Sequence, residues 1–426
     1  MKVLIVNTSQ ATGGAAIAAS RLTEALAASG VDARMLVRDA KAGPTQAVVL
    51  PASWRNKARF VYERGVIWLN NGMQRNNLFA LDIANTGADI TRLPEFREAD
   101  IIHLHWINQG MLSLNGIGKI LRSGKPVVWT MHDMWPFTGI CHYADGCGNY
   151  TTQCCRCPQL NGHGQRADLA WRTFCRKKQV YSHAPIAFVG CSKWIADLAR
   201  TSALMPGHTV TAIPNPIDTS LFAPADKTAA QAALGLSPDK NYILFTAMKV
   251  TDPRKGFRLL QHSINTWVKN YAEVATRTEL IIVGRDAAAL ADGFAIKVKP
   301  FEYISDTSTM VNLYNATSVY VTPSQQDNLP NTIMEAMACG VPCIGCDTGG
   351  IPEMIDDGIN GIIVKPGADR AGKFADAISR VLSPDENRRM SAAARRKVTE
   401  CYSPNVVARQ YINLYNRILN GNNTVS

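Results

Sequence analysis

Short apolar runs that alternate with helical segments constrain the fold of this chain more than any other feature of its sequence. Each run has the length and composition of a buried strand, and polar or small residues follow it. In the first half the runs are Lys2–Thr8, Ala33–Arg38, Asp100–Trp106, Lys125–Asp133, Ile186–Ser192 and Val210–Pro214. In the second half they include Tyr242–Met248, Leu280–Gly284 and Gly361–Val364. Strands that alternate with helices form parallel sheets, so the sequence predicts an α/β protein.

Length and composition are those of a globular protein with two domains. A chain of 426 residues is too long for one ordinary core, and two domains of roughly 200 residues each are expected. No apolar run reaches the ~18 residues that a membrane-spanning helix needs. The N-terminal sequence MKVLIVNTSQATGG lacks the apolar region and cleavage pattern of a signal peptide. We therefore expect a cytoplasmic protein that starts with a buried strand.

The net charge of +11 indicates an anionic partner. Nucleotide phosphates, a lipid diphosphate, an anionic membrane face and nucleic acid all fit this charge. Residues 54–75, WRNKARFVYERGVIWLNNGMQR, combine Lys57, Arg59 and Arg64 with aromatic side chains. Such a helix can lie on a membrane surface or cover a lipid-linked acceptor. The alternative, which we prefer, is a helix packed by its aromatic face with its Arg and Lys side chains in water.

A loop followed by a helix at Ser324–Pro342, SQQDNLPNTIMEAMACGVP, carries two acids eight residues apart. Asp327 lies on the loop and Glu335 inside the helical stretch, after the apolar run at Ser318–Ser324. Backbone N–H groups at the start of such a helix have no partner of their own and carry partial positive charge, which suits a phosphate. Both acids can therefore face one ligand. The alternative is an ordinary loop-to-helix junction with surface acids.

Three cations lie just beyond the strand at Tyr242–Met248. They are Lys249, Arg254 and Lys255, in KVTDPRKGF. Fixed cations at a strand end suit an anionic ligand. A solvated turn is the alternative.

The first half places polar residues at its own strand ends. Gly13 and Gly14 follow the first strand and let the backbone approach a ligand, although a plain tight turn fits equally well. His105, His132 and Asp133 come at the ends of two later strands. Because ligands of open α/β sheets collect at the carboxyl ends of strands, we expect the His132–Asp133 pair to be part of a site.

Five of the eleven cysteines fall within seventeen residues. Cys141, Cys147, Cys154 and Cys157 have a spacing that can supply a tetrahedral Zn²⁺ shell, with Cys155 as the odd member. A closed shell of four thiolates would be structural and not catalytic. Reduced thiols and disulfides are the alternatives, and a cytosolic location disfavours disulfides.

These segments, in this order, resemble those of the retaining, nucleotide-sugar-dependent glycosyltransferases of the GT-B fold, known as glycosyltransferase group 1 or family 4. Asp327 stands where that family usually has Glu in its acid-x7-acid signature, and Lys249 stands at the first position of its Arg-x5-Lys pattern. Residues 129–160, WTMHDMWPFTGICHYADGCGNYTTQCCRCPQL, are similar to a subgroup found in exopolysaccharide, colanic-acid-like and O-antigen pathways.

The resemblance implies two Rossmann-like domains whose parallel sheets face an inter-domain cleft. Residues 1–216, with the Cys-rich loop 139–160, would form an acceptor domain completed by a C-terminal helix at 403–420. Residues 217–402 would form the nucleotide-sugar donor domain.

The resemblance also implies roles for individual residues. Lys255 would hold the phosphates, while Asp327 would bond the sugar hydroxyls that His132 orients. Glu335 would bind the ribose. The full set of implied donor-binding residues is Gly13, Gly14, Lys249, Arg254, Asn328, Leu329, Pro330, Asn331 and Glu335.

The implied reaction moves a sugar, with retention, from a nucleoside-diphosphate sugar to a glycan carried on a polyprenyl diphosphate at the inner face of the membrane. The chain contains no D-x-D sequence, which is consistent with lysine and helix N–H groups neutralising the diphosphate without a catalytic metal. A non-catalytic nucleotide- or glycan-binding relative is one alternative. A basic zinc-containing nucleic-acid-binding protein is another, but it leaves Asp327 and Glu335 without a role, so we expect no nucleic acid partner.

Overall fold

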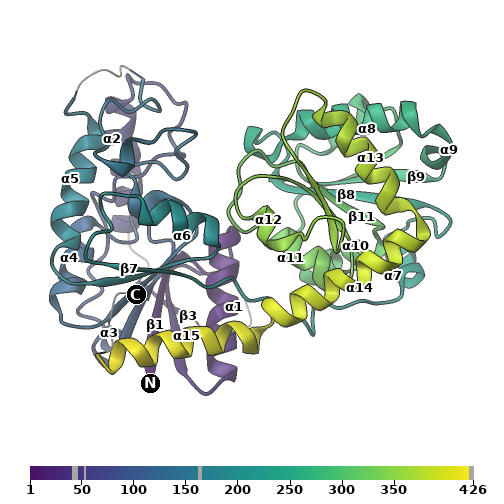
Figure 1. Ribbon diagram of the computed structural model, residues 1–426. Helices are drawn as coiled ribbons and strands as arrows, with labels where there is room; N and C mark the ends of the chain where they lie inside the picture. The colour runs from purple at the N-terminus through teal and green to yellow at the C-terminus, as the bar shows by residue number, and fades with distance from the viewer. Residues whose placement is uncertain (41–46, 52–53, 162–165, 422–426) are drawn as a thin grey trace. The chain divides into compact units, whose positions relative to one another are not determined.

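The computed structural model describes residues 1–40, 47–51, 54–161 and 166–421, except for the side chain of Arg55 (Figure 1). It divides into two compact units. The first contains Met1–Pro216 with Val407–Ser426, and the second contains Ile217–Val406. Each unit is built on one parallel sheet, and the two are described separately below.

The sheet of the first unit, as far as the chain is described, has seven parallel strands in the order β3-β2-β1-β4-β5-β6-β7. Its strands are β1 (Lys2–Ser9), β2 (Asp32–Asp39), β3 (Ala47–Val49), β4 (Ile101–Leu104), β5 (Val127–Met131), β6 (Ile186–Gly190) and β7 (Thr209–Ala212). Alternate side chains of β1 enter different cores, because successive residues of a strand point to opposite faces. Leu4 and Val6 join one core, and Val3 and Ile5 join the other.

Helices cover both faces of this sheet. The core around Val3 contains side chains of α1 (Gly14–Ala28) and of the C-terminal helix α15 (Pro404–Leu419). The core around Leu4 contains side chains of α4 (Leu114–Arg122), α5 (Leu169–Tyr181) and α6 (Lys193–Arg200). The other helical segments of the unit are α2 (Trp54–Asn70), α3 (Pro94–Glu98), η1 (Trp135–Phe137) and η2 (Asn149–Thr151).

The sheet of the second unit has six parallel strands within the described chain, in the order β10-β9-β8-β11-β12-β13. They are β8 (Asn241–Lys249), β9 (Thr278–Arg285), β10 (Val298–Phe301), β11 (Val319–Thr322), β12 (Cys343–Cys346) and β13 (Gly361–Val364). Its helices are α7 (Lys227–Ala233), η3 (Pro253–Lys255), α8 (Phe257–Asn270), α9 (Ala272–Thr276), η4 (Ala288–Gly293), α10 (Thr307–Ala316), α11 (Asn331–Ala338), α12 (Ile351–Met354), α13 (Arg370–Leu382) and α14 (Pro384–Cys401). Side chains of α8 and α13 pack in one core with those of β8 and β9.

Local sequence explains where many of the helices begin. A Ser or Asp side chain accepts a hydrogen bond from the backbone N–H three residues further on, which satisfies one otherwise unpaired donor of the first turn. The caps of this kind are Ser113, Asp168, Ser192, Asp226, Asp306 and Asp369.

The predicted fold class is confirmed, since both sheets are parallel and alternate with helices. The short edge strands β3 and β10 were not predicted, because three or four residues leave too little apolar pattern to recognise. Within the described residues, no helix is both long and apolar enough to cross a membrane.

Helix α2 differs from the arrangement that we preferred for residues 54–75. The helix ends at Asn70. The Trp54 residue is 77% exposed, while Arg64 is buried. The preferred interpretation, an aromatic face inside with Arg and Lys in water, is wrong for Trp54 and Arg64. It agrees with buried Ile67, half-buried Phe60 and Trp68, and exposed Lys57. Arg64 is retained inside because Asp82 pairs with it there.

Candidate functional site

In the second unit, the candidate site lies at the carboxyl edge of the sheet, where the strand order reverses. The chain runs outward from β8 to β9 and β10 and then returns to β11 on the other side of β8. Ligands of open α/β sheets bind at such a switch point. Because η3 follows β8 and a loop to α11 follows β11, the two predicted donor motifs come together there.

An ion pair joins these two motifs. Lys255 Nζ lies 2.6 Å from Asp327 Oδ2, although the residues are 72 positions apart in the chain. The lysine side chain is 29% exposed and the aspartate side chain 14% exposed, so both are accessible to a ligand. The pair presents a fixed cation and a hydrogen-bond acceptor at one point of the sheet edge.

Two glycines permit the close backbone contacts that hold this pair. Gly256 has a φ of 70°, and a Cβ atom there would lie 2.0 Å from the carbonyl oxygen of Pro323. Gly349 has a φ of 61°, and its Cβ atom would lie 1.7 Å from the carbonyl oxygen of Asp327. A larger residue at either position would therefore displace the loop that carries the acid.

The loop after Asp327 leads into α11. Asn328, Leu329 and Pro330 are buried, and Asn331 is the first residue of the helix. The N-cap residue of α11 is Pro330, whose side chain cannot accept a hydrogen bond, and the N–H groups of a helix start suit an anionic ligand.

Glu335 lies inside α11 and is 8% exposed. Its Oε2 atom accepts a hydrogen bond of 2.9 Å from the hydroxyl group of Tyr314. The tyrosine thus orients the second acid of the predicted signature.

The other two predicted cations are arranged differently from Lys255. The Arg254 guanidinium group forms an ion pair of 2.7 Å with Asp252 of its own turn. Lys249 is exposed at the end of β8, where the pairing with β9 is irregular. The structure therefore brings Lys255, and not these two residues, into contact with the acid.

In the first unit, the strand order reverses between β1 and β4. Gly13 precedes α1 with a φ of 91°, and Gly14 is the first residue of that helix. A Cβ atom at Gly13 would meet nothing within 4 Å. Glycine is therefore favoured there by the positive φ of the backbone and not by crowding. The backbone at this turn is open to a ligand.

Three histidines line up next to this switch point. His105 Nδ1 lies 2.9 Å from His132 Nε2, and His103 contacts the hydroxyl groups of Tyr415 at 2.7 Å and Thr130 at 2.8 Å. Burial lowers the pKa of His132 to about 4 and that of His103 to about 3. Near neutral pH these rings are therefore uncharged, and His132 can act as a hydrogen-bond partner but not as a cation.

Asp133 belongs to a buried network and not to an open site. It is 8% exposed, accepts a hydrogen bond from the Trp106 indole at 2.8 Å, and lies 2.7 Å from His142 Nδ1. His142 Nε2 lies 2.8 Å from Asp82 Oδ2 on its other side. Burial opposes the charged imidazolium, but the two carboxylates raise the pKa of His142 to about 10.

The sequence analysis did not identify this network. His142 stands next to Cys141 within the cysteine-rich segment, and Asp82 does not follow a predicted strand. Burial alone would raise the pKa of Asp133, but the charge and hydrogen bond of His142 lower it. Asp133 is thus held within this network next to His132, and its part in a ligand site stays a prediction.

The four cysteines of the predicted zinc site lie close together in the first unit. Cys141, Cys147, Cys154 and Cys157 line one small cavity, and all four are free thiols. However, across the described parts of the chain, no three His, Cys, Asp or Glu side chains are grouped so that they could hold a metal ion. Cys154 and Cys157 are buried in the core of the first unit, and Cys141 and Cys147 pack against it. The structural zinc shell stays a prediction.

Two family models match the chain. The model described as Glycosyltransferase Family 4 matches residues 12–221, and the model described as Glycosyl transferases group 1 matches residues 240–384. The first match includes Gly13, Gly14 and His132, and the second includes the Lys255–Asp327 pair and Glu335.

Known proteins with similar sequences and folds agree with these matches. The relative named "Putative colanic acid biosynthesis glycosyl transferase WcaC" from Escherichia coli (strain K12) is 25% identical over 60% of this chain, which spans 62% of that relative's length. A D-inositol 3-phosphate glycosyltransferase of Kribbella flavida is 25% identical over 90% of this chain and 85% of its own. The crystal structure of Alr3699/HepE from Anabaena in complex with UDP has a TM-score of 0.62 at 13% identity, covering 98% of this chain and 100% of that one, which shows a shared fold. The chain therefore belongs to the group 1, or family 4, glycosyltransferases with the GT-B fold.

Proposed function

We propose that this protein transfers a sugar from a nucleoside-diphosphate sugar to a hydroxyl group of an acceptor. The observation that carries the proposal is the contact between Lys255 and Asp327 at the switch point of the second sheet. It offers a cation for a diphosphate next to a carboxylate for sugar hydroxyls, as a nucleotide sugar requires. The UDP bound in the structure of Alr3699/HepE, which has the same fold, supports this choice of donor.

In the proposed reaction, a donor diphosphate takes over the Lys255 ammonium group and frees Asp327 to accept hydrogen bonds from the sugar. As the bond between the sugar and the phosphate breaks, negative charge grows on the leaving group. Lys255 then binds the leaving group more strongly than it binds the donor in its ground state, which lowers the barrier. The first turn of α11 would add its N–H groups, and Glu335 would bind the ribose.

We assign donor binding to residues 217–402. Acceptor binding is assigned to residues 1–216 together with 403–420. Gly13 and Gly14 would approach the donor diphosphate, and neutral His132 would orient donor sugar hydroxyls. Lys249 and Arg254 would contribute positive charge near the leaving group, although neither contacts Asp327.

The proposed stereochemical outcome is retention, by attack on the same face from which the diphosphate leaves. The departing phosphate then accepts the proton of the acceptor hydroxyl, so no protein nucleophile is needed. This proposal includes no catalytic metal, because Lys255 and helix N–H groups neutralise the diphosphate.

The acceptor that we propose is a glycan linked to a polyprenyl diphosphate, in surface polysaccharide biosynthesis at the cytoplasmic face of a membrane. The similarity to the protein named for colanic acid biosynthesis supports this choice. The similarity to D-inositol 3-phosphate glycosyltransferases favours a second candidate, a small phosphorylated acceptor.

A donor screen followed by turnover tests the proposal. The melting temperature is measured with a panel of UDP and GDP sugars, since a ligand that binds only the folded state raises it by mass action. Nucleotide release is then measured with the stabilising donor and either a lipid-linked glycan or inositol phosphate. Release that depends on an acceptor is expected. Donor stabilisation without release in the presence of any acceptor would instead identify a non-catalytic nucleotide-binding relative.

A further inference from the structure

Helix α2 of the first unit presents apolar side chains to solvent. Trp54, Val61, Tyr62 and Leu69 are between 60% and 77% exposed. With about 100° of rotation per residue, these four positions fall on one side of the helix. Met73 and Phe79, 63% and 64% exposed, follow the end of the helix, but Phe79 stacks on Phe60, on another side of it. We call the four helix residues the α2 face.

Exposed apolar residues are concentrated in this segment. Among the residues that the structure describes, four of the fourteen large hydrophobic side chains that are exposed belong to the α2 face. Scattered single residues of this kind are normal on a protein surface, but a group on one helix indicates a binding surface.

Charged residues on the opposite side prevent the helix from turning its apolar face inward. Glu63 is fully buried and accepts hydrogen bonds from the backbone N–H groups of Ile83 at 3.0 Å and Ala84 at 2.7 Å. Arg64 pairs with buried Asp82. Rotation would leave these buried charges without their partners, which is costly, so the orientation of α2 is held from inside.

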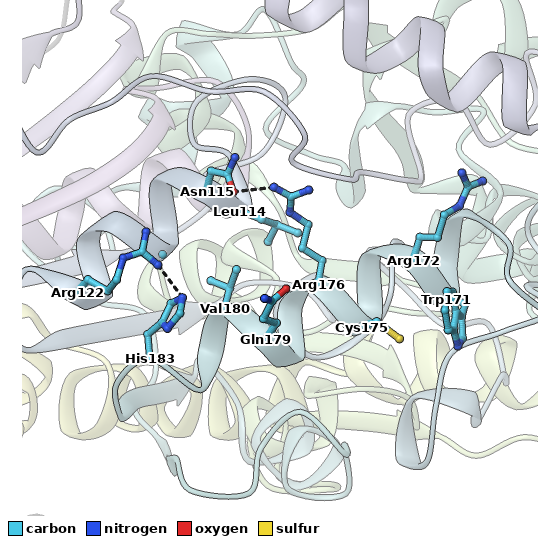
Figure 2. Close-up of a pocket in the computed structure, with 11 residues that line it drawn as sticks. Leu114, Asn115, Arg122, Trp171, Arg172, Cys175, Arg176, Gln179, Val180 and His183 are labelled. Atoms are coloured by element: carbon cyan, nitrogen blue, oxygen red, sulfur yellow. Dashed lines mark hydrogen bonds between the residues drawn. The ribbon is translucent and has the colours of Figure 1, made fainter.

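The surface next to α2 is strongly basic. Of the Lys and Arg side chains described in α2, α4 and α5, seven are exposed or half-buried, while Arg64, Lys177 and the single acid of these helices, Glu63, are buried. Between α4 and α5 lies a groove of about 660 Å³, shown in Figure 2. Its lining includes Arg122, Arg172 and Arg176.

The three groove arginines contact a histidine ring and two asparagine side chains. Arg122 contacts His183 Nε2 at 2.6 Å, and Arg176 donates to Asn115 Oδ1 at 2.6 Å (Figure 2). Arg172 donates to the Asn70 side chain at 2.8 Å. In the described part of the chain, none of the three forms an ion pair with a carboxylate, so their charge is available to an anionic partner. Because Asn70 is the last residue of α2, its bond to Arg172 also joins the groove to that helix.

We propose that the α2 face and the arginine groove together form a docking surface for an anionic lipid bilayer. The apolar side chains of the α2 face enter the interfacial layer, where Trp and Tyr are well accommodated, while lipid phosphates bind in the groove. A nucleic acid would use the arginines but has no use for exposed Val61 and Leu69. The inference deepens the proposed function, because a lipid-linked acceptor would be met at such a bilayer.

Vesicle binding tests the proposal with the full chain. Co-sedimentation is measured with phosphatidylcholine vesicles that contain or lack phosphatidylglycerol, in low and high salt. Binding is expected only with phosphatidylglycerol and should weaken in high salt. The variants Val61→Glu/Leu69→Glu and Arg172→Glu/Arg176→Glu should each bind at least about ten-fold more weakly, since one basic residue near such a surface contributes roughly five-fold.

The matched control variants are Ile359→Glu, at a 53% exposed apolar side chain of the second unit, and Lys365→Glu, at an exposed cation there. Both should bind vesicles as the wild type does. Melting temperatures equal to that of the wild type would show that the variants are folded. Equal stabilisation by the nucleotide donor would show that donor binding is intact, so loss of vesicle binding can be told apart from failure of the proposed function. The proposal is overturned if the protein does not bind phosphatidylglycerol vesicles or if either double variant binds them normally. It is also overturned if duplex DNA competes fully with the vesicles and the Val61→Glu/Leu69→Glu variant still binds DNA.

Discussion

The substitution Lys255→Ala tests whether Lys255 is a catalytic cation or only stabilises the fold. Its ion pair with Asp327 is partly exposed, at 29% and 14% for the two side chains, so solvent screens the attraction. Such pairs contribute about 0 to 1 kcal/mol to stability. In a unit of this size, 1 kcal/mol lowers the melting temperature by roughly 2 to 4 °C. Loss of a group that stabilises developing negative charge in the transition state costs about 3 to 4 kcal/mol, or roughly 100- to 1000-fold in turnover.

The assay compares nucleotide release and thermal melting for the wild type, Lys255→Ala and a control, Lys397→Ala. The control removes a similar pair, in which Lys397 Nζ lies 2.9 Å from Asp356 and the side chains are 24% and 39% exposed. Both variants should melt within a few degrees of the wild type, but only Lys255→Ala should lose turnover. Undiminished transfer by Lys255→Ala, or an equal loss in Lys397→Ala, would refute the reasoning.

Three further predictions concern the residues around the site. Gly349→Ala should destabilise the protein more than Gly30→Ala does in urea unfolding, because a Cβ atom meets the Asp327 backbone only at Gly349. Tyr314→Phe should lower the free energy of unfolding by about 1 to 3 kcal/mol and weaken nucleotide binding in calorimetry. The reason is that buried Glu335 loses the hydrogen bond from the Tyr314 hydroxyl group. The pKa of His142 is raised to about 10, so the stability that it contributes is fully present below pH 6.5 and lost as the pH rises toward 10. His142→Asn should therefore lower the free energy of unfolding by about 3 to 5 kcal/mol at pH 6 and by much less near pH 10. Equal losses of stability at both pH values would contradict a charged His142 in the folded protein.

Most of the fold could be predicted from the sequence, because the central strands are continuous apolar runs. β1, β5 and β9 are buried along nearly their whole length, and a strand covered on both faces shows that pattern directly. The burial of Arg64 in helix α2 was not predicted, since the composition of the helix does not reveal that Asp82 pairs with Arg64. That pairing depends on tertiary structure and leaves no local pattern.

The candidate site could be predicted only in part. Asp327 and Lys255 were each identified because each follows a strand, but their contact depends on β8 and β11 being neighbours, which local sequence does not specify. The thiol spacing of Cys141 to Cys157 fitted a metal shell. The structure brings these thiols around one cavity and packs them with the apolar core of the first unit, and the zinc shell itself stays a prediction.

A crystal structure with bound UDP or GDP tests the central claim most directly. The account predicts the β-phosphate within hydrogen-bond distance of Lys255 Nζ and the ribose hydroxyls against Glu335. A nucleotide bound in the same crystals away from both residues would contradict it.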